Sequence, residues 1–490
     1  MTVAKKAETA EHPGAQPAER PGSTGGTELG ANAVAALESL ATRHLVQPWE
    51  SLEHLGEEAR TLLTGADRIY VQDAKGNRLL DGPAGMWCMQ VGYGRREIAE
   101  AMAEQAMSLA YNSPWYSTSP VAAELAGRIA EMTPGDLDHV FFTTGGSTAV
   151  DSALRFVQFF NNYRGRPEKK IILSRGGAYH GSTFLSASCS GKERDRNFFD
   201  FATDRVVHLS APHPYRRPEG MSVEGFCDFL LEEMEAKILE LGPERVAAFI
   251  AEPILASGGV LMPPEGYHQR AQALCRKYDI LTIADEVVTA FGRLGHWFAS
   301  EAVFGFVPDI VTFAKGVTSG YVPLGGFAIS SKVIEQISGA ANKGSVYANG
   351  YTYSGHPVSC AAALANIRII EQEGLLAHVR EIAPYFQARL KELEELPLVG
   401  EVRGIGLMAC VDCVADKASR NPLALDKEVG ARIDAHCQEL GLVVRPIYNM
   451  CVMSPALIIE KPEIDKLVEI LRKGIELTQD DLEREGLWHR

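Results

Sequence analysis

One pattern, repeated between residues 139 and 330, restricts the fold more than any other feature of the chain: short apolar runs alternate with helical stretches. The runs lie at residues 139–144, 169–174, 205–210, 246–251, 280–284, 309–314 and 325–330. They lack the polar alternation of a strand with one face in water, so we expect strands that are buried on both faces. Strands that alternate with helices predict a mostly parallel sheet and therefore an α/β fold.

The length of 490 residues predicts more than one domain. Residues 1–30 are rich in Ala, Glu, Pro and Gly and are expected to form a disordered tail. We expect a large domain at residues 96–360 and a smaller domain at residues 361–490, with residues 31–95 assigned to the smaller one.

Charge and composition exclude several classes of protein. The formal net charge is −15 and no long basic run is present, which argues against a nucleic-acid partner. No apolar run approaches the ~18–20 residues that cross a membrane, and the N-terminus lacks the apolar segment of a secretory signal. The nine cysteines are an odd number in a chain too large to need disulfides, which favours reduced thiols and a cytoplasmic location.

Cys410 and Cys413 form the one close cysteine pair of the sequence. A CxxC pair can carry redox chemistry or half of a zinc site, but zinc needs a second pair at a suitable spacing, and the sequence has none. The surrounding GLMACVDCV is typical of a buried strand. We therefore expect both thiols to pack in a core, and we expect no metal site.

Chemically useful side chains follow four of the predicted strands. Glu252 follows VAAFIA, Asp285 follows ILTIA, Lys315 follows DIVTFA, and Tyr179 with His180 comes after KKIILS. In open parallel sheets, ligands bind at the carboxyl ends of the strands. The carboxylates and the lysine are therefore expected to meet over one site.

Gly145, Gly146 and Ser147 lie between a predicted strand and a predicted helix. Glycines let the backbone approach an anion, and the first turn of a helix offers free N–H groups and a positive dipole end. This segment predicts a phosphate site, with simple helix capping by Ser147 as the alternative. It is neither a Walker A loop nor a GxGxxG fingerprint, which argues against a nicotinamide-dependent dehydrogenase.

Together these parts match one cofactor, pyridoxal 5'-phosphate. A lysine amine can form an imine with an aldehyde, and a carboxylate can keep a pyridinium nitrogen protonated. An aromatic ring can stack on the heterocycle, and a helix N-terminus can hold a phosphate. Pyridoxal phosphate carries all four matching groups.

Eight motifs, in order, resemble the class III aminotransferases of the fold-type I pyridoxal-phosphate enzymes. They are TTGGSTAVDSALRF, GGAYHGST, IAEPILASGGVLMPPEGY, LTIADEVVTAFGRLG, PDIVTFAKGVTSGYVPLGG, YTYSGHPVSCAAALANI, VRGIGLM and GLVVRP. The resemblance extends from about residue 68 to residue 459, and Asp285 and Lys315 stand thirty residues apart as in that family. It implies a large domain with a mostly parallel sheet covered by helices, plus a smaller α+β domain.

The resemblance also implies a role for each matching residue. Lys315 would be the Schiff-base lysine and would then move the substrate proton as a base, and Asp285 would face the pyridine nitrogen. The remaining cofactor contacts would be Gly146 and Ser147 at the phosphate, Val287 and Tyr179 on the two ring faces, Glu252 near the ring, and Thr352 at the phosphate of the partner subunit's cofactor. An amine and then a keto acid would react in ping-pong order. The role of Thr352 predicts a homodimer or a dimer of dimers.

One residue departs from the family pattern, because Thr148 stands where a Glu usually follows the phosphate-binding serine. Gly146 and Ser147 remain, so we expect the change to affect neighbouring contacts rather than the phosphate site. His180 and Arg403 are expected to have structural roles.

The likeness is strongest to the amine:pyruvate and ω-amino acid:pyruvate branch, which implies a primary amine or ω-amino acid as donor and pyruvate as acceptor. Trp87, Trp115 and Tyr116 are the expected apolar walls of the substrate pocket. Arg445 would bind a carboxylate, whose two oxygens match its guanidinium. The alternatives are an amino mutase, a decarboxylase or a racemase on the same fold, or a transaminase that uses 2-oxoglutarate with a diamine or a 4-aminobutyrate-like donor.

Overall fold

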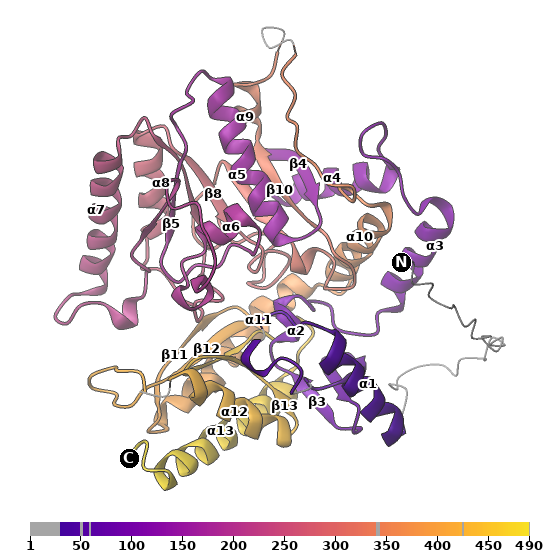
Figure 1. The fold of residues 1–490 in the computed structure, drawn as a ribbon, viewed down its shortest axis with the longest axis vertical. Coiled ribbons are helices and arrows are strands. Elements are labelled where there is room, and N and C mark those ends of the chain that lie inside the picture. The colour runs from indigo at the N-terminus through magenta and orange to yellow at the C-terminus, as the bar shows by residue number, and fades with distance from the viewer. Residues whose placement is uncertain (1–29, 50–51, 58–59, 340–343, 424–425, 490) are drawn as a thin grey trace, which may run out of the picture.

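The computed structural model describes residues 30–49, 52–57, 60–339, 344–423 and 426–489. Figure 1 shows an upper part with a large sheet and its covering helices, and a lower part that contains both the first and the last helix. The tail expected at residues 1–30 lies outside the described residues, except for Gly30.

The upper part is built on a sheet of seven strands. They are β4 (Leu137–Thr143), β5 (Ile171–Arg175), β6 (Val206–Leu209), β7 (Val246–Ala251), β8 (Leu281–Asp285), β9 (Ile310–Phe313) and β10 (Gly325–Ser330). Their order is β4-β10-β9-β8-β7-β5-β6. All pairs are parallel except those of β10 with β4 and β9. The mostly parallel sheet predicted from the seven apolar runs is therefore confirmed.

Helices cover both faces of this sheet (Figure 1). The covering helices are α5 (Gly146–Tyr163), α6 (Phe184–Cys189), α7 (Val223–Leu241), α8 (Tyr267–Lys277) and α9 (Ser331–Glu335). In β7, Ile250 packs in the apolar cluster that contains α5, whereas Phe249 and Ala251 pack in the cluster that contains α7 and α8. Successive side chains of a strand point to opposite faces, so a strand covered on both sides is apolar throughout.

The lower part combines the two ends of the chain. Its strands are β1 (Leu63–Asp67), β2 (Tyr70–Asp73), β3 (Arg78–Asp81), β11 (Val399–Ile405), β12 (Met408–Cys413), β13 (Leu442–Val443), β14 (Arg445–Ile447) and β15 (Met450–Met453). Its helices are α1 (Ala31–His44), α2 (Ala84–Trp87), α11 (Leu375–Lys391), α12 (Asp426–Glu439) and α13 (Lys461–Arg484). β3 pairs in parallel with β13, which joins the N-terminal hairpin to the C-terminal segment. Figure 1 accordingly shows α1 and β3 in the lower part, which also holds α12 and α13.

Three helices link the two parts. They are α3 (Arg96–Leu109), α4 (Pro120–Met132) and α10 (Pro357–Gln372), and α10 packs against the other two. One stripe of α10, with Ile370, belongs to the lower apolar cluster, and another, with Ile367, belongs to an upper one. The domain boundary expected near residue 360 thus falls within a helix that serves both parts.

Cys410 and Cys413 are buried in β12, where they pack in two different apolar clusters. Residues three apart in a strand point to opposite faces, so these thiols do not converge on one ligand. The packing interpretation of the CxxC pair is confirmed. All nine cysteines are free thiols. A search of the described helices finds none that is long and apolar enough to cross a membrane.

Candidate active site

The side chains that follow the strands of the large sheet meet at one edge, as expected from the sequence. Asp285 is the last residue of β8, Glu252 follows β7, and Lys315 begins a short 3-10 helix just after β9. β7 and β8 pair in parallel up to the residues just before Glu252 and Asp285. All three side chains line one cavity of about 540 Å³.

Asp285 is a buried carboxylate whose orientation is fixed by its neighbours. The backbone N–H of Val287 at 3.2 Å and Oγ1 of Thr312 at 3.0 Å donate to Oδ1. Nδ1 of the buried His180 lies 2.7 Å from Oδ2. A ring nitrogen that faces a carboxylate carries the proton, so His180 donates here. The structural role expected of His180 takes the form of this contact.

Lys315 has two features of a reactive amine. Its backbone adopts φ of 43°, a left-handed conformation that costs a non-glycine residue on the order of 1–3 kcal/mol and gathers at functional sites. Burial lowers the pKa of the amine, while the carboxylates of Asp285 and Glu252 act in the opposite direction. Within the described part of the chain, Lys315 forms no ion pair, so its amine is free to react.

The start of α5, at Gly146 and Ser147, is named the anion cradle here because its geometry suits the phosphate site predicted from the glycines. A Cβ atom on Gly146 would lie 3.0 Å from Cγ1 of Val287, and a Cβ atom on Gly181 would lie 2.7 Å from Oγ of Ser147. The backbone N–H of Ser182 donates to that same hydroxyl at 3.0 Å. The first N–H groups of a helix lack partners within the helix and attract an anion. The two glycines keep this corner of the cavity open.

Thr148 closes the first turn of α5. Its Oγ1 donates to the carbonyl of Gly145 at 2.9 Å and lies 3.3 Å from Oγ1 of Thr144. The hydroxyl is satisfied within its own turn and leaves Gly146 and Ser147 to face the cavity. Thr148 therefore makes its contacts beside the anion cradle, and the effect of replacing the family's Glu stays a prediction.

Glu252 fixes the position of Tyr179. Its Oε1 accepts the backbone N–H of Tyr179 at 3.0 Å, and its Oε2 accepts that of Ala256 at 3.1 Å. Burial raises the pKa of Glu252, and the neighbouring His180 lowers it. The hydroxyl of Tyr179 lies 3.0 Å from Oγ of Ser182, which ties this ring to the anion cradle.

These residues fit pyridoxal phosphate. The amine of Lys315 can form an imine, since burial lowers its pKa. The fixed carboxylate of Asp285 suits a pyridinium nitrogen. The space that a Cβ would fill at Gly146, beside free helix N–H groups, suits a phosphate. Tyr179 and Val287 line the cavity between these groups and offer apolar surface for a flat ring.

Trp87 and Arg445 line the same cavity, as the sequence predicted for a substrate pocket. Arg445 is the first residue of β14, and its guanidinium lies 5.1 Å from the centre of the Trp87 ring. Burial lowers the pKa of Arg445. Among the residues that the structure describes, it has no ion-pair partner. A partly buried cation without an anion is suited to take one from solution.

The other three predicted contacts lie elsewhere in the chain. Trp115 and Tyr116 are 84% and 86% exposed, and Thr352 is exposed as well. None of them lines the cavity of its own subunit. Their assigned roles therefore require a second subunit and stay predictions.

Two cavity residues had no recognisable signal in the sequence. Lys192 lies in the loop after α6, in the charged segment GKERDR, which reads as a solvated loop. Ser257 lies in the loop after β7, and Nζ of Lys192 is 2.5 Å from its Oγ. The packing of these two loops brings Lys192 and Ser257 together, and such packing produces no local pattern in the sequence.

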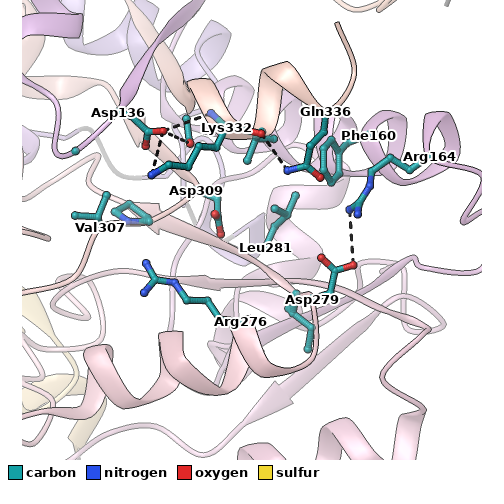
Figure 2. A pocket seen from close by; sticks show the side chains of 15 residues that line it. Asp136, Phe160, Arg164, Arg276, Asp279, Leu281, Val307, Asp309, Lys332 and Gln336 are labelled. Carbon is teal, nitrogen blue, oxygen red and sulfur yellow. Dashed lines mark hydrogen bonds and ion pairs between the residues drawn. The ribbon is translucent and has the colours of Figure 1, made fainter. Parts of the chain in front are cut away.

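Figure 2 shows a second hollow, of about 750 Å³, at the opposite edge of the sheet. Asp309 precedes β9 and Leu281 begins β8, so this hollow lies at the amino ends of the parallel strands. Its charges largely pair with one another, because Lys332 lies 3.6 Å from Asp136 and Arg164 lies 3.7 Å from the carboxylate of Asp279. Such pairing makes it a weak receptor for a charged ligand, and the reactive side chains lie at the other edge.

Comparison with known proteins agrees with this geometry. The family model for aminotransferase class-III matches residues 54–475. Putrescine–pyruvate aminotransferase of Pseudomonas aeruginosa is 40% identical over 443 residues, which cover 90% of this chain and 96% of that protein. The mitochondrial gamma-aminobutyrate transaminase 1 of Oryza sativa subsp. indica is 40% identical over 414 residues, 84% of this chain and 80% of that one.

A solved structure extends the match to the whole fold. The omega transaminase of Pseudomonas jessenii, in complex with PMP, superposes with a TM-score of 0.89 at 35% identity, covering 91% of this chain and 99% of that one. A match over 91% of the chain takes in both the large sheet and the smaller part. This chain therefore belongs to the class III aminotransferases, enzymes that transfer amino groups with pyridoxal phosphate.

Proposed function

We propose that this aminotransferase takes an amino group from a primary amine or an ω-amino acid and gives it to an α-keto acid, with pyruvate as the acceptor. The observation that carries this proposal is that Arg445 lies over the ring of Trp87 in the cavity that also contains Lys315. An aromatic wall suits an apolar amine, and an unpaired guanidinium suits a carboxylate. The name of the Pseudomonas aeruginosa relative contains putrescine and pyruvate, and the name of the rice relative contains gamma-aminobutyrate. These names support a primary amine or an ω-amino acid as the donor.

The residues of the cavity divide the work of the reaction. Bound pyridoxal phosphate supplies an aldehyde that takes up the amino group and a ring that accepts electrons. Lys315 would anchor the cofactor and then carry the proton of the donor carbon on Nζ, and burial lowers the pKa of this amine, which favours its neutral form. Asp285, held by His180 and Thr312, keeps the ring nitrogen protonated. Gly146 and Ser147 hold the phosphate.

The remaining residues hold or complete the site. Tyr179 and Val287 would pack on the two faces of the cofactor ring, and Glu252 positions Tyr179 through its backbone N–H. Thr352 reaches the phosphate in the partner's site. The nine free thiols favour a reducing compartment, which supports a cytoplasmic location.

The experiment that tests this proposal measures the two half-reactions separately, by the absorption of the bound cofactor. The wild-type enzyme should be converted by carboxylate-free amines and ω-amino acids, and pyruvate should reverse the conversion. Arg445→Ala should weaken the pyruvate half-reaction by roughly 2–4 kcal/mol, the scale for loss of one partner of a buried charge pair. The half-reaction with a carboxylate-free amine should change little, because such an amine has no group for Arg445 to bind.

Arg403→Ala is the matched control for this substitution. Arg403 is another buried arginine of the lower part, and its Nη1 donates to Glu401 at 2.7 Å and Asp412 at 2.8 Å, outside the cavity. Its loss should lower the unfolding temperature and affect both half-reactions alike. If Arg445→Ala, like the control, slowed both half-reactions equally, Arg445 would have a structural role. An enzyme that no amine converts would contradict the proposed function itself.

We also propose a homodimer, or a dimer of dimers, whose interface includes the surface around Trp115 and Tyr353. Both side chains are exposed, and Tyr353 contacts Tyr111 edge to face with ring centroids 6.3 Å apart. Exposed aromatic clusters of this kind favour a protein partner. Light scattering should give a mass of at least twice the 53.3 kDa of the chain.

Trp115→Asp should shift the equilibrium between dimer and monomer toward the monomer. The activity should fall with it, since Thr352 could no longer reach the active site of the partner subunit. Leu239→Asp is the control, because Leu239 is 57% exposed on α7 and lies apart from this surface. A monomer that keeps full activity at low concentration would disprove the shared site.

A further inference from the structure

We infer that Lys192 is a second anion receptor in the active-site cavity, which allows the enzyme to take dicarboxylic keto acids and amino acids in addition to monocarboxylates bound by Arg445. This inference rests on the proposed function and extends it to a substrate class. Both cations line the cavity that contains Lys315 and Asp285. Lys192 and Arg445, two of the cations that line it, match the two charges of a dicarboxylate.

The position of Lys192 is fixed by the backbone. The N–H of Gly191 donates to the carbonyl of Ala178 at 2.9 Å, and the N–H of Gly177 donates to the carbonyl of Gly191 at 3.0 Å. A Cβ on Gly191 would lie 2.3 Å from the carbonyl oxygen of Arg175, so only glycine permits this approach. The strand end that presents Tyr179 therefore also presents Lys192.

The direct contacts of the Lys192 ammonium group are to neutral groups. Its Nζ lies 2.5 Å from Oγ of Ser257 and 5.7 Å from the centre of the Tyr179 ring. In the described parts of the chain, no carboxylate forms an ion pair with it. The neighbouring Arg194 differs, because its Nε donates to Asp195 at 2.8 Å. Lys192 is thus a partly buried cation that faces the cavity with a neutral hydroxyl as its hydrogen-bond partner.

The surrounding charges agree with a site for an incoming anion. Burial lowers the pKa of Lys192 to about 8, and Arg194 and Arg445 lower it as well, whereas Asp195 and Glu252 raise it. A bound carboxylate would offset both the cost of burying the charged amine and the repulsion between the cations, since an opposite charge favours the charged amine. The receptor is therefore protonated in neutral solution and loses its charge as the pH rises through about 8.

Binding of unreactive acids to the holoenzyme tests this inference without turnover. Glutarate and valerate have the same chain length and differ in the second carboxylate, and calorimetry gives the dissociation constant of each. The wild type should bind glutarate roughly tenfold to a hundredfold more tightly than valerate, the range for a hydrogen bond to a charged group. Lys192→Met should lose most of this preference and keep its affinity for valerate, and Lys192→Arg should retain part of the preference.

The preference of the wild type should also fall between pH 7 and pH 9, because Lys192 loses its proton in that range. Equal affinities for the two acids in the wild type would overturn the inference. A Lys192→Met enzyme with an altered cofactor absorption and an unchanged glutarate preference would also overturn it, and would show that Lys192 only holds Tyr179. If the enzyme preferred glutarate but no amine converted its cofactor, the proposed function would be contradicted, whereas the role of Lys192 as an anion receptor would still be supported.

Discussion

Lys315→Ala should abolish turnover, with a loss of at least about a thousandfold, because general acid–base catalysis alone contributes roughly 10²–10⁴. Lys315 provides a cavity amine with a pKa lowered by burial and no ion pair among the described residues. The anion cradle at Gly146 and Ser147 is untouched by the substitution. The variant should therefore still bind cofactor, measured by equilibrium dialysis. In the wild type, borohydride reduction and peptide mapping should place the cofactor label on Lys315.

One further variant and a rescue experiment separate the loss of the amine from the loss of its charge. Lys315→Arg keeps the positive charge but stays protonated, so it should be as inactive as Lys315→Ala. A small amine added to the solution should restore part of the activity of Lys315→Ala, since the truncation leaves room for it, and should not restore Lys315→Arg. Substantial transamination by Lys315→Ala without added amine would refute the assignment of Lys315 as the base.

Asp285→Asn should lower the rate of each half-reaction by about a hundredfold or more, the scale for loss of one preorganised electrostatic partner. The amide keeps the shape of the side chain and can still accept the hydrogen bonds of Val287 and Thr312 at Oδ1. It loses the charge that holds a proton on the ring nitrogen. Stopped-flow absorption of the cofactor with an amine, and then with pyruvate, measures both rates.

Thr312→Val is the matched control for Asp285→Asn. It removes the 3.0 Å hydrogen bond to Oδ1 and preserves the charge, so it should cost only about 1 kcal/mol, or less than tenfold in rate. Thr312 is buried in β9, and valine fills a similar volume in a strand. Near-normal rates for Asp285→Asn, or equal losses in the two variants, would mean that the charge of Asp285 is not what the ring requires.

Local patterns predicted the large sheet and its reactive edge. The apolar runs identified all seven strands of the large sheet, because strands covered on both faces are mostly apolar. Asp285 and Lys315 follow two such strands, so the rule for carboxyl ends placed them together before any contact was known. The glycines at 145 and 146 predict the anion cradle by the same local logic, since they stand between a strand and a helix.

Tertiary structure decided the features that depend on contacts between distant segments. β10 runs against its two neighbours, and β3 pairs with β13, although nothing in their own sequences specifies a partner or a direction. His180 reads as an ordinary histidine until the fold places it against Asp285. Trp115 resembled a pocket wall in the sequence, but its exposed position shows that a single subunit gives it no pocket.

The sequence by itself determined which residues could perform the chemistry, because strand periodicity, helix starts and turn glycines act over a few neighbouring residues. Only the tertiary structure decided which cavity charges have no ion-pair partner among the described residues. Arg445 and Lys192 each lie in a loop or short strand whose sequence does not reveal a partner, and whether a cation is neutralised depends on every segment packed around it. The catalytic centre follows from local sequence, whereas the charges that select its substrates follow from how distant loops pack together.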